Sequence, residues 1–462
     1  MALSLRRPFF AVLLVAAACT FPGAVAAGAP AVAEADYADL RWRLLGPFRG
    51  GWATAVAGIP GDPATFYFGG ADGGVWKTTD AGVTWRPVFE RDRASSIGAL
   101  AISPSDANVI WVGTGQVHQR WDVVSGEGLF RSTDGGATWK PAGLADSRHI
   151  GKIWVDPQNA NVAVVAALGH LFGPGGERGL FRTEDGGKSW ARVLYRDADT
   201  GAVEIAGDPA HPERLYAALW QVRRHPWMDY FQPTQGPGSG VYSSADGGCT
   251  WTAAGRSGWP EGDLGRIALA VVPGSGGRGV WAAVSGKGLF GSSDGGATWS
   301  LLNPNGGLAG SYIANLTPDP RDPATLWAMG RGILKSVDGG KSFAVAKGAP
   351  GGDDYHILWI DPSDSRHMIT GADQGAVVTL NGGASWSSWY NQPTGQFYRL
   401  AADKRFPYWV YSGQQDSGTV AIASRSDYGQ LTFRDWHPVG GTSAPSGAGG
   451  VSRPGIAAIE YS

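Results

Sequence analysis

One eight-residue pattern recurs along the chain and constrains its fold more than any other feature. The pattern has Ser or Thr first, Asp or Asn third, Gly fifth, Ser or Thr seventh and Trp or Phe last. Seven copies occur, at 78–85, 132–139, 183–190, 244–251, 292–299, 336–343 and 379–386. Their third residues are 43 to 61 residues apart, about the length of one four-stranded blade. The repeats therefore predict an all-β fold, a seven-bladed β-propeller with one such hairpin, or Asp-box, in each blade.

The residue types in each box suit a tight turn. A third-position carboxylate or carboxamide can accept hydrogen bonds from the N–H groups of its own turn, and Gly adopts positive φ without strain. The closing aromatic residue is expected to pack between neighbouring sheets. We therefore predict structural rather than catalytic roles for the third residues, which are Asp80, Asp134, Asp185, Asp246, Asp294, Asp338 and Asn381.

Each period reads as four strands. In the second period, alternating apolar residues predict strands at 97–102, 109–115 and 128–132, with a fourth after the box. We expect the propeller to span 28–390. Residues 391–438 begin the strand pattern again without a further box, which predicts a partial extra blade or the start of a second propeller. The remainder, 439–462, is rich in Gly, Ser, Ala and Pro and is predicted to be disordered.

The first 27 residues have the pattern of a secretory signal peptide. Arg6 and Arg7 precede an apolar run that ends at Cys19, too short to span a bilayer, and small residues follow to Ala27. This predicts a secreted or periplasmic protein, with lipidation at Cys19 left as an alternative. Cys249 would then be the only cysteine, expected to be a small buried residue in its box.

Charge and composition exclude some functions. A net charge of -2 argues against nucleic-acid binding by bulk electrostatics, and no later segment is apolar enough to cross a membrane. His118, His170 and His225 lie on different loops without ligand spacing, so we expect no metal site. We also expect no cofactor and a monomer.

Function is expected on the propeller face opposite the boxes, where the loops after each second strand emerge. Three of these loops are long, at 114–128, 168–179 and 220–240. Their aromatic, His and Arg side chains could stack on sugars or clamp a peptide. The alternative is that the tryptophans only pack the loops onto the ring. The candidate substrate-binding residues are Trp121, His118, Arg120, His170, Trp220, Arg223, Arg224, His225, Trp227 and Tyr230.

Three acidic residues occupy the same position within their repeats and are expected on that face. Asp72, Asp373 and Asp416 each follow a predicted second strand directly. An inverting glycosidase needs one protonated carboxyl group and one water-activating carboxylate about 6.5 to 9.5 Å apart. We take Asp72 as one catalytic acid and Asp416 or Asp373 as its partner. Alternatively, all three acids only bond the N–H groups of their own turns.

The boxes resemble those of the Asp-box (BNR repeat) propellers, which include sialidases, sortilin-type receptors and family-74 xyloglucanases. Segments 46–70, 146–174 and 391–422 look closest to exported bacterial proteins labelled glycosyl hydrolase or sortilin N-terminal-domain (VPS10-like). The xyloglucanase resemblance implies that Asp72, with Gly73 and Gly74 after it, matches one catalytic aspartate. Asp416 matches the other less closely, because Ser417 and Gly418 replace the usual residues.

The resemblance leaves two functions open. One is an exported glycoside hydrolase that cleaves a polysaccharide with paired aspartates, inverting and xyloglucanase-like. The other is a non-catalytic, sortilin-like propeller that binds peptide or glycan on the same face. A sialidase is less well supported, since Phe48-Arg49 is followed by Gly50-Gly51 where Ile-Pro is expected.

Overall fold

The computed structural model describes residues 34–439, apart from 42, 47, 91–93, 121–122, 176, 350 and 416. It divides into two compact units, 1–44 and 45–462. In the described residues the first unit holds a short helix, α1 (Glu34–Tyr37), and the second holds the strands. The predicted signal peptide and residues 440–462 of the predicted tail lie outside the described residues.

Each period that contains a box forms one antiparallel sheet with its strands in chain order. The first sheet contains β1 (Ala53–Gly58), β2 (Phe66–Gly70), β3 (Val75–Thr78) and β4 (Arg86–Pro87). The second contains β5 (Ile97–Ile102), β6 (Ile110–Thr114), β7 (Leu129–Ser132) and β8 (Lys140–Pro141). The third contains β9 (Ile150–Val155), β10 (Ala163–Ala167), β11 (Gly179–Thr183) and β12 (Ala191–Leu194). The fourth contains β13 (Thr200–Asp208), β14 (His211–Gln221), β16 (Gly240–Ser244) and β17 (Thr252–Ala253).

The later periods continue the same topology. Between the fourth and fifth sheets, β15 (Gln235–Gly236) pairs with β18 (Leu264–Gly265). The fifth sheet contains β19 (Ile267–Val271), β20 (Val280–Val284), β21 (Gly288–Ser292) and β22 (Ser300–Asn303). The sixth contains β23 (Leu316–Pro318), β24 (Leu326–Ala328), β25 (Ile333–Ser336) and β26 (Ala344–Lys347). The next contains β27 (Tyr355–Ile360), β28 (Met368–Ala372) and β29 (Gly375–Thr379).

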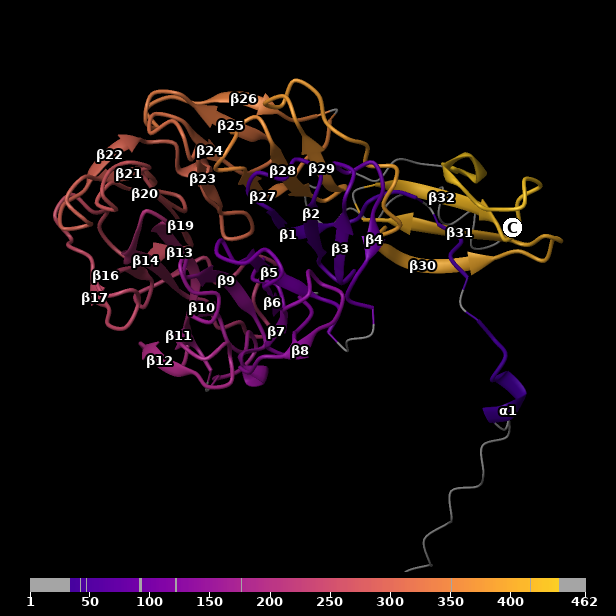
Figure 1. Cartoon of the computed structure of the whole chain (residues 1–462), viewed down its shortest axis with the longest axis horizontal. Helices are drawn as coiled ribbons and strands as arrows, with labels where there is room; N and C mark the ends of the chain where they lie inside the picture. Colours follow the sequence, from indigo (N-terminus) through magenta and orange to yellow (C-terminus); the bar gives the residue numbers. More distant parts are fainter. Residues whose placement is uncertain are drawn as a thin grey trace, which may run out of the picture. The chain divides into compact units, whose positions relative to one another are not determined.

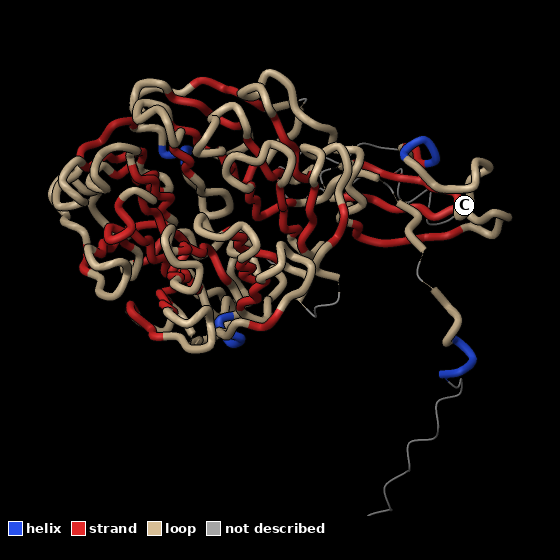
Figure 2. The backbone as a smooth tube through the Cα atoms, in the orientation of Figure 1, coloured by secondary structure: helices blue, strands red, loops and turns tan. Residues whose placement is uncertain are grey.

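A further sheet follows the last box. It contains β30 (Phe397–Ala402), β31 (Trp409–Gln414), β32 (Gly418–Ala423) and β33 (Trp436–His437). Strands dominate the described chain (Figure 2), and the helical segments besides α1 are the single turns η1 (Ala145–Ser147), η2 (Gly306–Leu308) and η3 (Phe433–Asp435). The all-β prediction is therefore confirmed.

The first strands of the box-containing sheets meet at a common centre. In the second unit, β1, β5, β9, β13, β19, β23 and β27 contact one another in this order, and β27 contacts β1. Figure 1 shows these sheets following one another around that centre. Second strands such as β2, β6, β10, β20 and β28 are buried along their whole length. They pair on both edges and pack against neighbouring sheets on both faces, which explains their apolar sequences.

The boxes form the predicted hydrogen-bonded turns. Oδ1 of Asp134 accepts hydrogen bonds from Ser132 Oγ (2.7 Å) and the Thr138 amide (2.9 Å), and Oδ2 accepts one from Thr138 Oγ (2.6 Å). These bonds, those from Thr138 above all, lower the pKa of Asp134 to about 2. Gly136 has φ of 85°, as the turn requires. The same bonds recur in the other boxes, and in the last one Asn381 donates through Nδ2 to Ser385.

Aromatic residues tie each sheet to the next. Tyr67 on β2 donates to the Gly135 carbonyl of the second box (3.0 Å), and Trp281 on β20 donates to the Gly339 carbonyl of the sixth (3.1 Å). In the other direction, Trp139 of the second box donates to the Val88 carbonyl of the first sheet (2.7 Å). The prediction that the box aromatics pack between sheets is confirmed.

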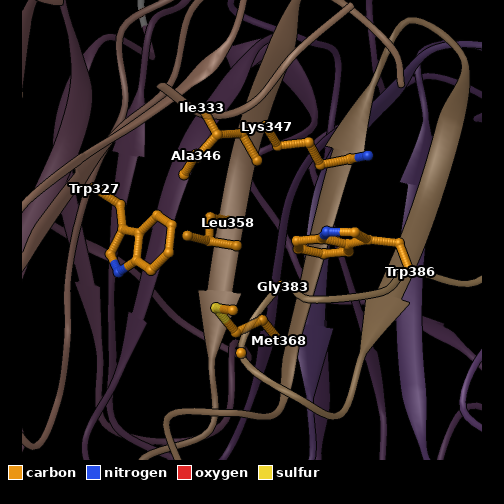
Figure 3. A pocket seen from close by; sticks show the side chains of 9 residues that line it. Trp327, Ile333, Ala346, Lys347, Leu358, Met368, Gly383 and Trp386 are labelled. Atoms are coloured by element: carbon orange, nitrogen blue, oxygen red, sulfur yellow. The ribbon is translucent and has the colours of Figure 1, made fainter. Parts of the chain in front are cut away.

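A small cavity of about 40 Å³ remains between the sixth sheet and the next (Figure 3). Its lining is mainly apolar and includes Trp327, Leu358, Met368 and Trp386. The side chain of Lys347 extends over the ring of Trp386, with its Nζ 5.3 Å from the ring centroid. Burial lowers the pKa of this ammonium group below its ordinary value.

Candidate functional site

Aromatic, histidine and arginine side chains from distant parts of the chain meet where the first strands converge. The rings of His118 and His356 lie 4.7 Å apart, and Trp52 lies 5.3 Å from His118 and 4.9 Å from His356. Tyr312 closes the group, 5.5 Å from His356. The guanidinium of Arg120 lies over Trp52, 3.7 Å from its ring centroid. We call these five residues the central cluster.

A buried carboxylate bonds to the central cluster. Oδ1 of Asp373 lies 2.7 Å from Nε2 of His356. The same nitrogen receives a hydrogen bond from Nε1 of Trp52. A neutral imidazole nitrogen either carries a hydrogen or accepts one, so Nε2 cannot satisfy both contacts at once. The protonation of His356 and Asp373 is therefore coupled.

Burial controls the electrostatics of the cluster. Burial is the main reason that the pKa values of His118 and His356 lie well below the ordinary value, and the nearby cations Arg120 and Arg266 lower them further. Burial also lowers the pKa of Arg266 to about 10. Arg266 still has defined partners, since its Nη1 donates to the Tyr312 carbonyl at 2.8 Å. Both histidines are therefore neutral at pH 7, beside charged guanidinium groups.

Gly50 and Gly51, which come shortly before β1, contact two other segments of the chain beside the central cluster. We call this pair of glycines the hub. The Gly50 amide donates to the Trp389 carbonyl (2.9 Å), and the Gly51 amide donates to Oγ1 of Thr394 (3.0 Å). A Cβ on Gly50 would lie 2.1 Å from the Gln374 carbonyl oxygen, and one on Gly51 would lie 2.0 Å from that of Thr394. Only glycine permits both approaches. The hub thus joins the turn after β28 to segment 394–396.

Asp72 is exposed on the loop between β2 and β3 and lies next to this segment. A Cβ on Gly73 would lie 3.8 Å from the Thr394 side chain. A hollow of about 140 Å³ lies beside the loop, lined by Gly73, Gly74, Phe89 and Ser95 among others. The loop of Asp72 is therefore open to a ligand.

Asp416 and Trp121 lie outside the described residues, but the neighbours of Asp416 are described. The Gln415 amide donates to the Gln396 carbonyl at 2.9 Å. Gln414 approaches Gly395 so closely that a Cβ there would lie 2.4 Å from its Nε2. The end of β31 and the turn after it thus contact Gly395 and Gln396, whereas the Asp72 loop lies beside Thr394.

The loop between β14 and β16 is held in a defined shape. Arg224 is buried and donates to the carbonyls of Tyr230 (2.6 Å) and Asp229 (3.1 Å). His225 stacks on Trp227 at 4.8 Å, and the Trp227 side chain is 80% exposed. Phe231 reaches the central cluster, 5.8 Å from Tyr312.

The other predicted binding residues have separate partners. Trp220 is fully buried among apolar side chains of the ring. Arg223 pairs with Asp199 at 3.1 Å. His170 is on the loop between β10 and β11, and its Nε2 lies 2.9 Å from Oδ1 of Asp146. Of the predicted residues, the structure brings His118, Arg120 and Asp373 together, while Trp220 belongs to the packing of the ring.

The sequence comparisons concern only parts of the chain. A family model described as BNR/Asp-box repeat matches residues 130–141. A xyloglucanase from Paenibacillus sp is 27% identical over 214 residues, which cover 42% of this chain and 20% of the relative. A xyloglucanase from Hypocrea jecorina is 31% identical over 105 residues, which cover 21% of this chain and 12% of the relative.

The solved structures extend the similarity to most of the chain. A GH74 enzyme from Niastella koreensis matches with a TM-score of 0.60 and 15% identity, covering 82% of this chain and 60% of that one. A GH74 xyloglucanase from Xanthomonas campestris matches with a TM-score of 0.59 and 18% identity, covering 89% of this chain and 70% of that one. The chain is therefore similar in fold to the GH74 propellers over most of its length. It spans about a fifth of the Paenibacillus relative's length.

Sequence reasoning missed several residues at the centre of this GH74-like propeller, namely Trp52, Arg266, Tyr312, His356 and Phe231. Trp52 and Arg266 directly precede β1 and β19, and His356 is the second residue of β27. The signal that could have found them is a bulky polar or aromatic residue at the start of a first strand, where other sheets have Gly98 and Gly151. His356 sits in a register shift of β27, and similar shifts occur in β1, β5, β9 and β13.

Two remaining sequence expectations concern sulfur and metals. The expectation that Cys249 is buried was wrong: its position in the box turn leaves the thiol exposed. Within the described part of the GH74-like propeller, no group of three or more His, Cys, Asp and Glu side chains could hold a metal ion. No helix there is long and apolar enough to cross a membrane.

Proposed function

We propose that this GH74-like propeller is an exported glycoside hydrolase that acts on a polysaccharide. One observation carries the proposal: the exposed Asp72 loop lies beside Thr394, and Gln414 and Gln415, which precede Asp416, contact the next two residues, Gly395 and Gln396. Two carboxylates on neighbouring loops are what an inverting mechanism needs. The similarity to xyloglucanases supports a plant-type β-glucan as the substrate class.

The proposed roles follow from environment. An exposed carboxylate is accessible to water and suits the base that activates it, so we assign this role to Asp72. The partner must be protonated to donate to the leaving oxygen, and Asp416 is our first choice. Asp373 is the second choice, because its contact with neutral His356 offers a place to hold a proton.

The glycan would extend from the acids across the loop between β14 and β16. Exposed Trp227, stacked on His225, offers a flat aromatic face to a sugar ring. Tyr230 and the loop that carries His170 would line the same path. His118 and Arg120 would act indirectly, by holding the other residues of the central cluster in place.

The test is turnover of a panel of β-glucans and xyloglucan. We expect the purified wild type to release reducing ends with inversion, and Asp72→Asn and Asp416→Asn each to lose at least a hundredfold in kcat. Asp263→Asn, at an exposed acid elsewhere on the surface, serves as the matched control and should keep full activity. No hydrolysis by the wild type, or full activity in Asp72→Asn, contradicts the proposal.

The competing function is a sortilin-like propeller that binds peptide or glycan without cleaving it. Trp227, exposed and stacked on His225, favours it, because stacking on a sugar or peptide needs no carboxylate. Under this function, Trp227→Ala weakens ligand binding at least tenfold, whereas Asp72→Asn leaves binding unchanged and no turnover occurs. Calorimetry with xyloglucan oligosaccharides separates the two functions.

We further propose the following domain organisation: a signal peptide at 1–27, a closed seven-bladed ring at 28–390 and the start of a second propeller at 391–438. The order of contacts among the first strands, with β27 against β1, supports ring closure. Export of the full chain should yield a product that begins after residue 27, as measured by mass spectrometry. A crystal structure of that product with an open ring contradicts the blade count.

A further inference from the structure

A serine and a histidine that have no role in the proposed glycosidase mechanism face each other: Ser125 on the loop between β6 and β7, and His149 directly before β9. Oγ of Ser125 lies 3.5 Å from Nε2 of His149, the residue before β9. Ser125 is exposed, whereas His149 is 1% exposed. An exposed hydroxyl therefore sits against the edge of a buried imidazole.

The hydrogen bonds define the tautomer of His149. Its Nδ1 lies 2.8 Å from the Gln116 carbonyl oxygen, which can only accept, so Nδ1 carries the hydrogen. In the neutral ring Nε2 is then an acceptor, and its lone pair points at Ser125. A carbonyl that orients one nitrogen while the other faces a hydroxyl is the arrangement that activates a serine nucleophile.

The backbone holds both partners rigidly. The Gly126 amide, directly after Ser125, donates to the Arg148 carbonyl, directly before His149, at 2.7 Å. A Cβ on Gly126 would lie 2.3 Å from the Thr114 carbonyl carbon, so only glycine permits this close approach. Arg148 has φ of 63°, a strained conformation for a residue other than glycine, and such strain concentrates at functional sites.

We propose that Ser125 and His149 form a nucleophilic dyad that accepts the acyl group of small carboxylic esters. Ser125 Oγ attacks the ester carbonyl while its proton passes to Nε2 of His149. The bond to the leaving alcohol breaks, and the alcohol takes that proton. Water then attacks acyl-Ser125 by the same route and releases the carboxylic acid. The exposed side chain of Val124 provides an apolar surface for the acyl chain.

The environment of His149 gives the dyad a distinctive pH dependence. Burial lowers the pKa of His149 to about 4; the positive charges of Arg178 and Arg148 and the neighbouring His170 add to the decrease, and the Gln116 carbonyl opposes it. The base therefore stays unprotonated at pH 5, where a histidine of ordinary pKa is almost fully protonated. Low basicity also makes the acceleration modest, about tenfold to a hundredfold over an isolated serine.

The experiment treats the full chain with an alkyl fluorophosphonate and locates the adduct by mass spectrometry. We expect modification of Ser125, with a rate at pH 5 at least half of that at pH 7.5. Ser125→Ala should abolish it. His149→Asn should reduce it at least tenfold, since an asparagine amide can keep the bond to Gln116 but supplies no base. Ser105→Ala, at an exposed serine on the opposite face, should change nothing.

Three results overturn the proposal: no adduct on the wild type, an adduct that survives Ser125→Ala, or equal rates in His149→Asn and wild type with matching melting temperatures. Release of nitrophenol from nitrophenyl acetate provides a second readout and should follow the same order of variants. Neither measurement depends on glycan turnover, so each stands or falls separately from the proposed glycosidase function.

Discussion

Oδ1 of Asp373 lies 2.7 Å from Nε2 of His356, and the side chains of both residues are buried where the first strands meet. The pair links the turn after β28 to the start of β27. It also joins one of the acids found by sequence, Asp373, to a cluster residue that sequence reasoning missed, His356. The properties of this cluster can be tested without knowledge of the substrate.

Asp373→Asn should lower the free energy of unfolding by about 1 to 3 kcal/mol. The amide can keep one hydrogen bond to His356 but loses the strength that the negative charge gives it. Exposed Asp72 has no such burial, so Asp72→Asn should change stability by less than about 0.5 kcal/mol. Urea denaturation of both variants measures the difference, and equal midpoints would show that the buried pair contributes nothing.

Stability should fall as the pH falls below about 6.5. In the folded protein His118 and His356 have pKa values well below 6.5, whereas in the unfolded chain they have ordinary values. The unfolded state therefore binds more protons below pH 6.5, and each histidine costs up to about 1.4 kcal/mol per pH unit until its folded pKa is reached. Urea midpoints between pH 7.5 and 5 measure this slope.

The histidine contribution to that slope can be isolated with variants. The double substitution His118→Gln, His356→Gln should reduce the pH dependence to the part that buried His149 contributes. The same change at His211, which is half-exposed and lies outside the cluster, controls for the substitution itself. A double variant that keeps the full slope would assign the effect to other groups.

Gly50→Ala should displace the hub, because its Cβ would lie 2.1 Å from the Gln374 carbonyl oxygen. The atoms closest to this Cβ belong to the backbone, so no flexible side chain can move away. We therefore expect the free energy of unfolding to fall by roughly 1 to 3 kcal/mol. Gly73→Ala provides the matched control, since its Cβ meets nothing closer than 3.8 Å. Thermal unfolding should show a lower Tm for Gly50→Ala alone; similar Tm values in both variants would refute the hub.

Asn381→Asp should be tolerated at pH 7, with a change in stability below about 1 kcal/mol. Oδ1 of Asn381 already accepts from the Ser385 amide (2.9 Å) and from Oγ1 of Thr379 (2.9 Å), as the aspartates of other boxes do. A carboxylate would only reverse the bond that Nδ2 now donates to Ser385 Oγ. Asn381→Leu, which removes all three bonds, should lower Tm clearly, and a neutral effect would show that this box is dispensable.

Much of the fold could be predicted because its determinants are local. Strand β5 begins and ends at the predicted residues, 97 and 102, and β6 and β7 fall within the predicted segments. Alternating apolar residues and a turn with its own hydrogen bonds carry this information within about ten residues. The candidate acids Asp72 and Asp373 could be found because they share one phase of the repeat.

The central cluster could not be predicted in this way. Nothing near Trp52 in the sequence indicates that its partner is His356, 304 residues away. The full burial of Trp220 likewise depends on which sheets lie beside it. The dyad of Ser125 and His149 also depends on tertiary structure, since the two residues are 24 positions apart in the sequence and only the fold brings them together.

By itself the sequence determined the all-β class, the hairpin turns and the places where long loops emerge, because each of these depends on interactions between residues close along the chain. Only the tertiary structure decided which loops meet. Closing the circle of first strands brings Trp52, Arg266 and His356 to one point and buries His118, Arg120 and Asp373 there. Burial removes water from His118 and His356, and this loss of water, rather than residue type, keeps both imidazoles neutral.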